Sequence, residues 1–105
     1  MGLADNQGRD EVFAEALAIV REIFEWELAA TRWDGAAQVL DALAEAAESD
    51  DLAAVRQAVA DLELRGPVRI TRIGATPVVP PPPPVRERLN HLVHRLSGGP
   101  GPERR

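Results

Sequence analysis

The residues best suited to bind a metal are a glutamate and two histidines near the C-terminal end. Glu87, His91 and His94 follow one another at spacings of four and three, which places them on one face of a helix. No second cluster of metal-ligating residues occurs elsewhere in the chain, and cysteine is absent. We therefore interpret the three side chains as solvated residues and expect neither a metal nor a cofactor.

No pattern in the chain predicts catalysis. A Ser-His-Asp order, a glycine-rich phosphate loop and a Walker motif are all missing, and the many carboxylates lie on alanine-rich helical patterns. Asp50 and Asp51 could begin a calcium loop, but the apolar residues 52–55 stand where oxygen ligands are required. Helix capping explains the two aspartates, and we expect the protein not to be an enzyme.

Length and composition indicate one domain in a reducing compartment. A chain of 105 residues supports a single hydrophobic core, and the absence of cysteine excludes a disulfide scaffold. The first residues are polar and acidic, unlike a signal peptide, and no stretch reaches the roughly 18 to 20 apolar residues of a membrane helix. We therefore expect a cytoplasmic protein that does not span a membrane.

Charge divides the chain into two parts. Residues 1–64 carry 15 acidic and 4 basic side chains, whereas residues 65–105 carry 2 acidic and 8 basic side chains. Every basic residue is an arginine. Either the acidic part and the arginine-rich part attract each other within the fold, or the basic part faces a partner. Both interpretations remain open at this point.

The spacing of apolar residues predicts a mainly α protein, a small helical bundle. The expected segments are a disordered N-terminus (1–9), a three-helix body (10–64), a basic β-prone segment (65–79), a polyproline spacer (80–84), a C-terminal helix (85–97) and a disordered tail (98–105). The five prolines of the spacer favour a stiff polyproline II rod. The C-terminal helix can close the bundle over the first helix or dock into a partner.

Three helical patterns make up the body. They run from the N-cap Asp10 to about Thr31, from Asp34 to Glu48, and from Leu52, after the turn at Ser49 to Asp51, to Leu64. Trp33-Asp34-Gly35 marks the break between the first two. Because the second helix has an alanine-rich face that permits close approach, we expect it to pack antiparallel on the first as a hairpin.

The basic segment changes to a β-type pattern. Its β-branched run, residues 68–73, is followed by Gly74-Ala75 and then by residues 76–79, which predicts either a short β-hairpin or an extended loop. The order of helices followed by this segment loosely resembles a winged helix-turn-helix. Against binding to DNA, the would-be recognition helix carries four acidic residues and only Arg56.

Two stretches resemble a known family. DLELRGPVRITRIGATPV and the closing VRERLNHLVHRL are similar to the CATRA-associated small proteins of actinobacteria, over roughly residues 10–97. The resemblance implies a short accessory protein encoded beside a caspase-like protease and TPR-containing partners, in conflict systems such as antiphage defence. It implies an adaptor, a regulator or a protease substrate, and it supplies no catalytic residues.

The resulting hypothesis is binding to a protein partner, with a DNA-binding regulator as the alternative. The basic segment would add as a strand to a partner's sheet while the C-terminal helix docks into a groove. The expected partner-binding residues are Arg65, Arg69, Ile70, Arg72, Ile73, Arg86, Leu89 and Leu92. Self-association remains open, and nucleic acid is not the expected partner.

Overall fold

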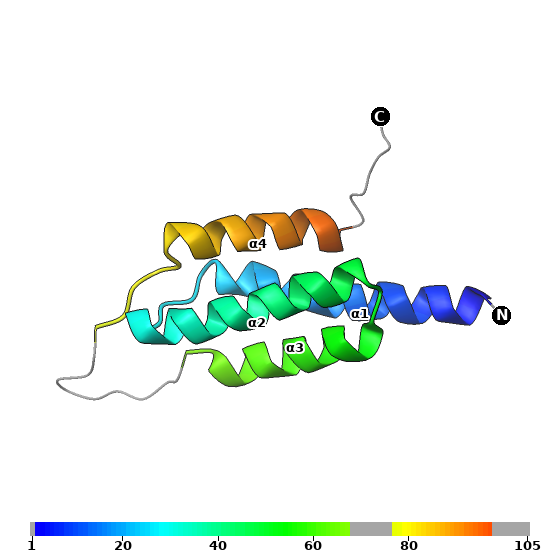
Figure 1. Cartoon of the computed structure of the whole chain (residues 1–105), viewed down its shortest axis with the longest axis horizontal. Coiled ribbons are helices and arrows are strands. Elements are labelled where there is room, and N and C mark those ends of the chain that lie inside the picture. Colours follow the sequence, from blue (N-terminus) through cyan, green and yellow to red (C-terminus); the bar gives the residue numbers. More distant parts are fainter. Residues whose placement is uncertain (1, 68–76, 98–105) are drawn as a thin grey trace.

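A computed structural model describes residues 2–67 and 77–97, with side chains from residue 8 onward. It contains the helices α1 (Gly2–Ile23), α2 (Ala30–Glu48), α3 (Leu52–Arg65) and α4 (Pro83–Leu96), as Figure 1 shows. Within the described residues the only β structure is one isolated bridge. The prediction of a mainly α, small helical bundle is therefore confirmed.

In the bundle, α3 and α4 separate α1 from α2. α3 and α4 each pack against both α1 and α2, so α1 and α2 lie on one diagonal of the bundle. In Figure 1, α1 and α3 run in one direction and α2 and α4 in the other. The expected α1–α2 hairpin is wrong as a packing unit, because the apolar stripes of α3 and α4 fill the space on either side between those helices.

The core takes large side chains from every helix. The most deeply buried are Val20, Ile23, Leu28, Trp33, Leu40, Leu43, Val55, Leu62, Leu89 and Leu92. α4 contributes four buried residues, including Leu89 and Leu92, and contacts α1 and α2. Of the two roles considered for the C-terminal helix, the structure therefore shows closure of its own bundle.

α1 begins earlier than its sequence pattern predicted. Residues 2–9, expected to be disordered, form its first turns and extend past the ends of the other helices (Figure 1). Asp10 therefore lies inside the helix and does not cap it. Arg9 connects this part of α1 to the turn after α2: its Nε donates to Asp50 Oδ1 at 2.7 Å, and its guanidinium lies 4.5 Å from the centre of the Phe13 ring.

α1 also ends at Ile23 instead of near Thr31, although the apolar spacing continues to Leu28. Leu28 leaves the helix because its N–H and C=O both pair with Val79, at 3.0 and 2.9 Å. This contact joins residues 51 positions apart, which no local pattern reveals. α2 then begins at Ala30, so Trp33-Asp34-Gly35 lies inside the helix and is not a break.

Replacing Gly35 by alanine should therefore stabilise α2. A Cβ at this position would meet only the side chain of Arg65, whose flexible end, Nη1, lies 2.5 Å away and can move. Since glycine inside a helix costs up to about 1 kcal/mol relative to alanine, we expect Gly35→Ala to raise the free energy of unfolding by about 0.5 kcal/mol or more in urea titrations. A smaller increase in the free energy of unfolding would show that moving the Arg65 side chain costs free energy.

The turn between α2 and α3 forms as predicted. Asp51 is the N-cap of α3, and its Oδ1 accepts a hydrogen bond from the N–H of Ala54 at 3.1 Å. Asp50 adopts a φ of 57°, which aspartate tolerates better than most residues. This turn reverses the chain so that α3 runs antiparallel to α2.

α4 incorporates part of the proline run. Pro83 and Pro84 form its first turn, where a missing N–H costs nothing, so the expected spacer is reduced to residues 80–82. Residues 68–76 and 98–105 lie outside the described residues, and with them the predicted hairpin and disordered tail. None of the described helices combines the length and the apolar character that crossing a membrane requires.

Candidate protein-interaction surface

Two stems lead from the bundle into residues 68–76, and side chains anchor the first stem at the end of α3. Arg32 Nη2 donates to the carbonyl oxygens of Arg65 and Gly66, at 3.0 and 3.3 Å. These contacts satisfy carbonyl groups that the end of a helix leaves without partners. The Trp26 ring packs closely on Gly66, where an added Cβ would lie 3.2 Å from the ring.

The second stem is anchored at Val79. Its carbonyl oxygen accepts from the N–H of Leu28 and also from Trp33 Nε1, at 3.0 and 2.9 Å. The residues two positions away on either side, Pro77 and Pro81, have no N–H and cannot extend this pairing into a ladder. A single bridge therefore holds the stem against Leu28, in the connection between α1 and α2, and one indole hydrogen bond holds it against Trp33 of α2.

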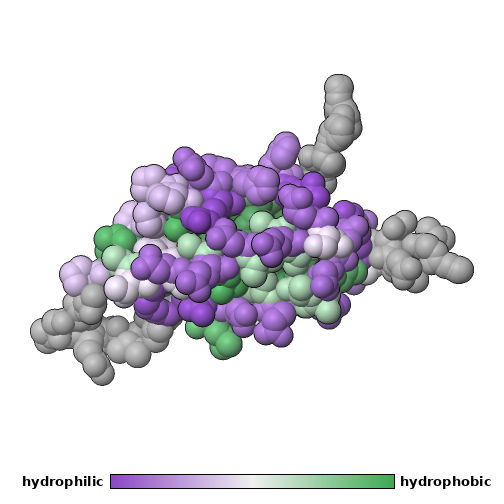
Figure 2. Space-filling model, viewed as in Figure 1, coloured by the Kyte–Doolittle hydropathy of each residue, from purple (hydrophilic) through white to green (hydrophobic). Residues whose placement is uncertain are grey.

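Exposed hydrophobic residues lie at the end of α3 and on the second stem. Among the described residues, the large apolar side chains that are exposed are Leu64, at 83%, Val78, at 52%, and Val79, at 39%. We refer to these three residues and the exposed Arg65 together as the stem surface. Most of the face in Figure 2 is hydrophilic, with strongly hydrophobic groups standing out along its lower and left edges. Exposed apolar side chains and arginine are groups that protein interfaces use.

The predicted partner-binding residues occupy different places. Arg65 lies on the stem surface, and Arg86 is exposed on α4 with its guanidinium 5.9 Å from the centre of the Phe24 ring. Arg69, Ile70, Arg72 and Ile73 lie outside the described residues. Leu89 and Leu92 are 0% and 1% exposed, so their prediction as partner contacts is wrong for the closed bundle: α1 and α2 already cover them.

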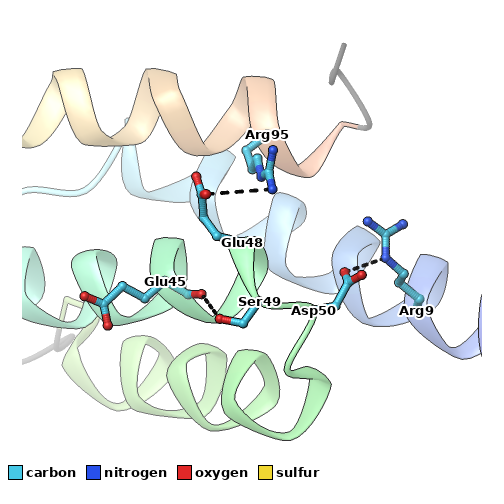
Figure 3. A network of polar contacts seen from close by, with 6 residues as sticks. All are labelled: Arg9, Glu45, Glu48, Ser49, Asp50 and Arg95. Carbon is cyan, nitrogen blue, oxygen red and sulfur yellow. Dashed lines mark hydrogen bonds and ion pairs between the residues drawn. The ribbon is translucent and has the colours of Figure 1, made fainter. Parts of the chain in front are cut away.

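Ion pairs join α4 to α2. Arg88 Nε lies 2.7 Å from Asp41 Oδ1, and Arg95 Nη2 lies 4.0 Å from Glu48 Oε1, the second of which is drawn in Figure 3. The predicted attraction between the acidic part and the arginine-rich part therefore operates at α4. All four side chains are substantially exposed, so each pair contributes only about 0.2–1 kcal/mol.

The histidines of α4 do not assemble a metal site in the described part of the chain. His91 and Glu87 line a groove between α2 and α4, beside the Arg88–Asp41 pair, and His94 is exposed. No three His, Cys, Asp or Glu side chains of residues 8–67 and 77–97 come together as a possible ligand set. This groove therefore offers no evident chemistry.

The combination of four helices, anchored stems and an intervening basic segment can be compared with known families. The model of the family described as CATRA-Associated Small Protein (CATASP) matches residues 15–100. The chain belongs to this family. The CATASP match includes the C-terminal part of α1 from residue 15 onward, the other three helices, both stems and residues 68–76. No curated protein and no solved structure matches the chain.

Sequence reasoning missed part of the surface of this CATASP protein. Leu64 follows Leu62 by two positions, so on a helix it points away from the buried stripe, and this spacing was a usable signal. Val78 and Val79 were assigned only to a returning strand. Their exposure depends on the pairing of Val79 with Leu28, a contact between distant segments that the sequence does not encode locally.

Proposed function

We propose that this CATASP protein is a non-enzymatic adaptor or regulator that binds a protein partner in the cytoplasm. The observation that carries the proposal is the stem surface, on which exposed Leu64, Val78 and Val79 flank a basic segment anchored at both ends. Anchored ends reduce the entropy that the segment loses on binding. The family name supports an accessory role, since it describes a small protein associated with a CATRA system.

A caspase-like protease or a TPR protein of a bacterial conflict system, such as actinobacterial antiphage defence, is the partner we propose. The resemblance of GPVRITRIG and of the closing helix to CATRA-associated proteins supports this choice. The β-branched run of residues 68–73 suits addition to the edge of a partner's sheet, with Arg69 and Arg72 supplying charge complementarity to an acidic rim. Leu64 and Val78 would then contact apolar residues beside that edge.

Affinity purification of the tagged full-length protein from its native host tests this proposal. We expect Arg69→Glu/Arg72→Glu to reduce recovery of the partner at least about tenfold. The new glutamates would repel the acidic residues of the partner that the two arginines are proposed to attract. The matched control, Arg21→Glu/Arg56→Glu, makes the same charge change at exposed helical positions and should not reduce recovery. Mass spectrometry of the eluate identifies and quantifies the partner.

Nuclease treatment separates the proposal from the DNA-binding alternative. Partners that persist after nuclease support an adaptor. Partners lost after nuclease, together with duplex-DNA binding that weakens steeply with salt, would instead favour a DNA-binding regulator. Equal recovery with the Arg69/Arg72 variant and with the unmodified protein would remove the basic segment from the interface.

A further inference from the structure

α4 shows how this bundle holds a basic amphipathic helix. Its apolar stripe is buried against α1 and α2, while Arg88 and Arg95 reach Asp41 and Glu48. The two arginines are seven residues apart on α4, and the two acidic residues are seven apart on α2. Residues at this spacing lie two turns apart on the same side of a helix, so both charge pairs form along one seam.

A second groove, between α1 and α3, offers similar chemistry but holds no helix. It has a volume of about 350 Å³, and its lining residues are Glu15, Ala18, Ile19, Glu22, Val59 and Glu63. Its apolar lining consists of Ile19 and Val59, which are buried, and Ala18, which is exposed. Glu15 and Glu22 stand on the α1 side seven residues apart, the same spacing as the acidic pair of α2 that receives α4.

The acidic side chains of this groove lack the compensation found under α4. No ion pair within 4.0 Å joins Glu15, Glu22 or Glu63 to another residue in the described part of the chain. Arg21, in the last turn of α1, and Arg56, on α3, are exposed and form no such pair within the described residues. Three carboxylates around one groove create a negative potential that attracts cationic side chains.

We propose that the groove between α1 and α3 binds a basic amphipathic helix from a protein partner. Two Arg or Lys side chains seven residues apart meet Glu15 and Glu22, and the apolar residues between them pack on Ala18, Ile19 and Val59. This surface lies along the side of the bundle, apart from the stem surface at its end. A protein that uses both surfaces can hold two partners at once.

A synthetic peptide with the sequence of residues 83–97 is a suitable probe, because it has the required charge spacing and apolar stripe. We expect it to bind the full-length protein and to shift amide NMR signals of α1 and α3 around the groove. A peptide with Arg88→Gln and Arg95→Gln should bind about three- to tenfold more weakly. No binding, or shifts confined to α2 and the protein's own α4, would overturn the proposal.

Changes on the protein side test the same contacts. Glu15→Gln/Glu22→Gln should weaken peptide binding about three- to tenfold, whereas the matched control Glu27→Gln/Glu45→Gln should leave it unchanged. All four glutamates are exposed, so both variants should keep the fold, which circular dichroism verifies. Equal weakening by both variants would indicate attraction to overall charge and would overturn the specific groove.

Sedimentation of the full-length protein alone distinguishes a second copy from another protein. A monomer supports the proposal. A dimer that Glu15→Gln/Glu22→Gln dissociates would show that the groove receives another copy of this chain, which would overturn the assignment to a different partner. Because these experiments use a defined peptide and the isolated protein, their outcome does not depend on recovery of a partner through the stem surface.

Discussion

Replacing Trp33 by alanine is expected to lower the free energy of unfolding by about 3–5 kcal/mol. The indole is 1% exposed, and its Nε1 donates to the carbonyl oxygen of Val79, so the change opens a cavity and also releases the second stem. Since small domains have a total stability of about 5–15 kcal/mol, the variant should be partly unfolded at 37 °C. Urea titration followed by circular dichroism at 25 °C measures the loss.

Trp33→Phe separates packing from the hydrogen bond. Phenylalanine keeps most of the buried ring but has no N–H, so we expect a smaller loss of about 1–2 kcal/mol. Hydrogen exchange at the amide of Val79 should accelerate in both variants, because that amide pairs with Leu28 in the same anchor. A loss below about 1 kcal/mol for Trp33→Ala would contradict the burial of this side chain.

Leu89→Ala should also be strongly destabilising, by about 2–5 kcal/mol. Leu89 is fully buried at the contact of α4 with α1 and α2, and shortening it leaves a cavity there. The control is Leu64→Ala, which removes the same atoms from a side chain that is 83% exposed and should change stability by less than about 0.5 kcal/mol. Urea titration of the two variants side by side makes the comparison.

These leucine variants also decide between two uses of α4. If Leu89→Ala left stability unchanged and weakened partner recovery, α4 would be a docking helix, which is one of the two roles that its sequence left open. If it lowers stability while Leu64→Ala weakens partner recovery, the result supports a core role for Leu89 and the proposed partner contact of Leu64. An amphipathic stripe records only that one face of a helix is covered, and the covering surface can belong to the same chain or to another.

The helical segments were predictable from local signals, but both ends of α1 and the start of α2 were not. Periodicity located the helical segments, and Asp51 marked the start of α3 correctly. The same periodicity extended α1 through Leu28, because a residue in a bridge and a residue on a helix can both be apolar and buried. The bridge to Val79 overrides the helical tendency of residues 24–28, and its partner lies in another part of the sequence.

The interaction surface was only partly predictable for a related reason. Charge singled out Arg65, which is exposed at the end of α3, and the GPVRITRIG stretch led to the family that the comparison then showed. Exposure of Val78 could not be inferred, because it depends on the anchoring of Val79 by Leu28 and Trp33. Side-chain types indicate what a surface can bind, whereas long-range contacts determine which side chains reach that surface.

The anchoring of Val79 imposes an order on folding during synthesis. A nascent chain that has emerged only as far as residue 76 contains α1, α2 and α3, yet it has neither the acceptor for Trp33 Nε1 nor the partner for Leu28. The faces of α1 and α2 that α4 covers are still open at that stage. Completion of the core must therefore await emergence of α4 from the ribosome, and until then the chain offers apolar surface to chaperones and proteases.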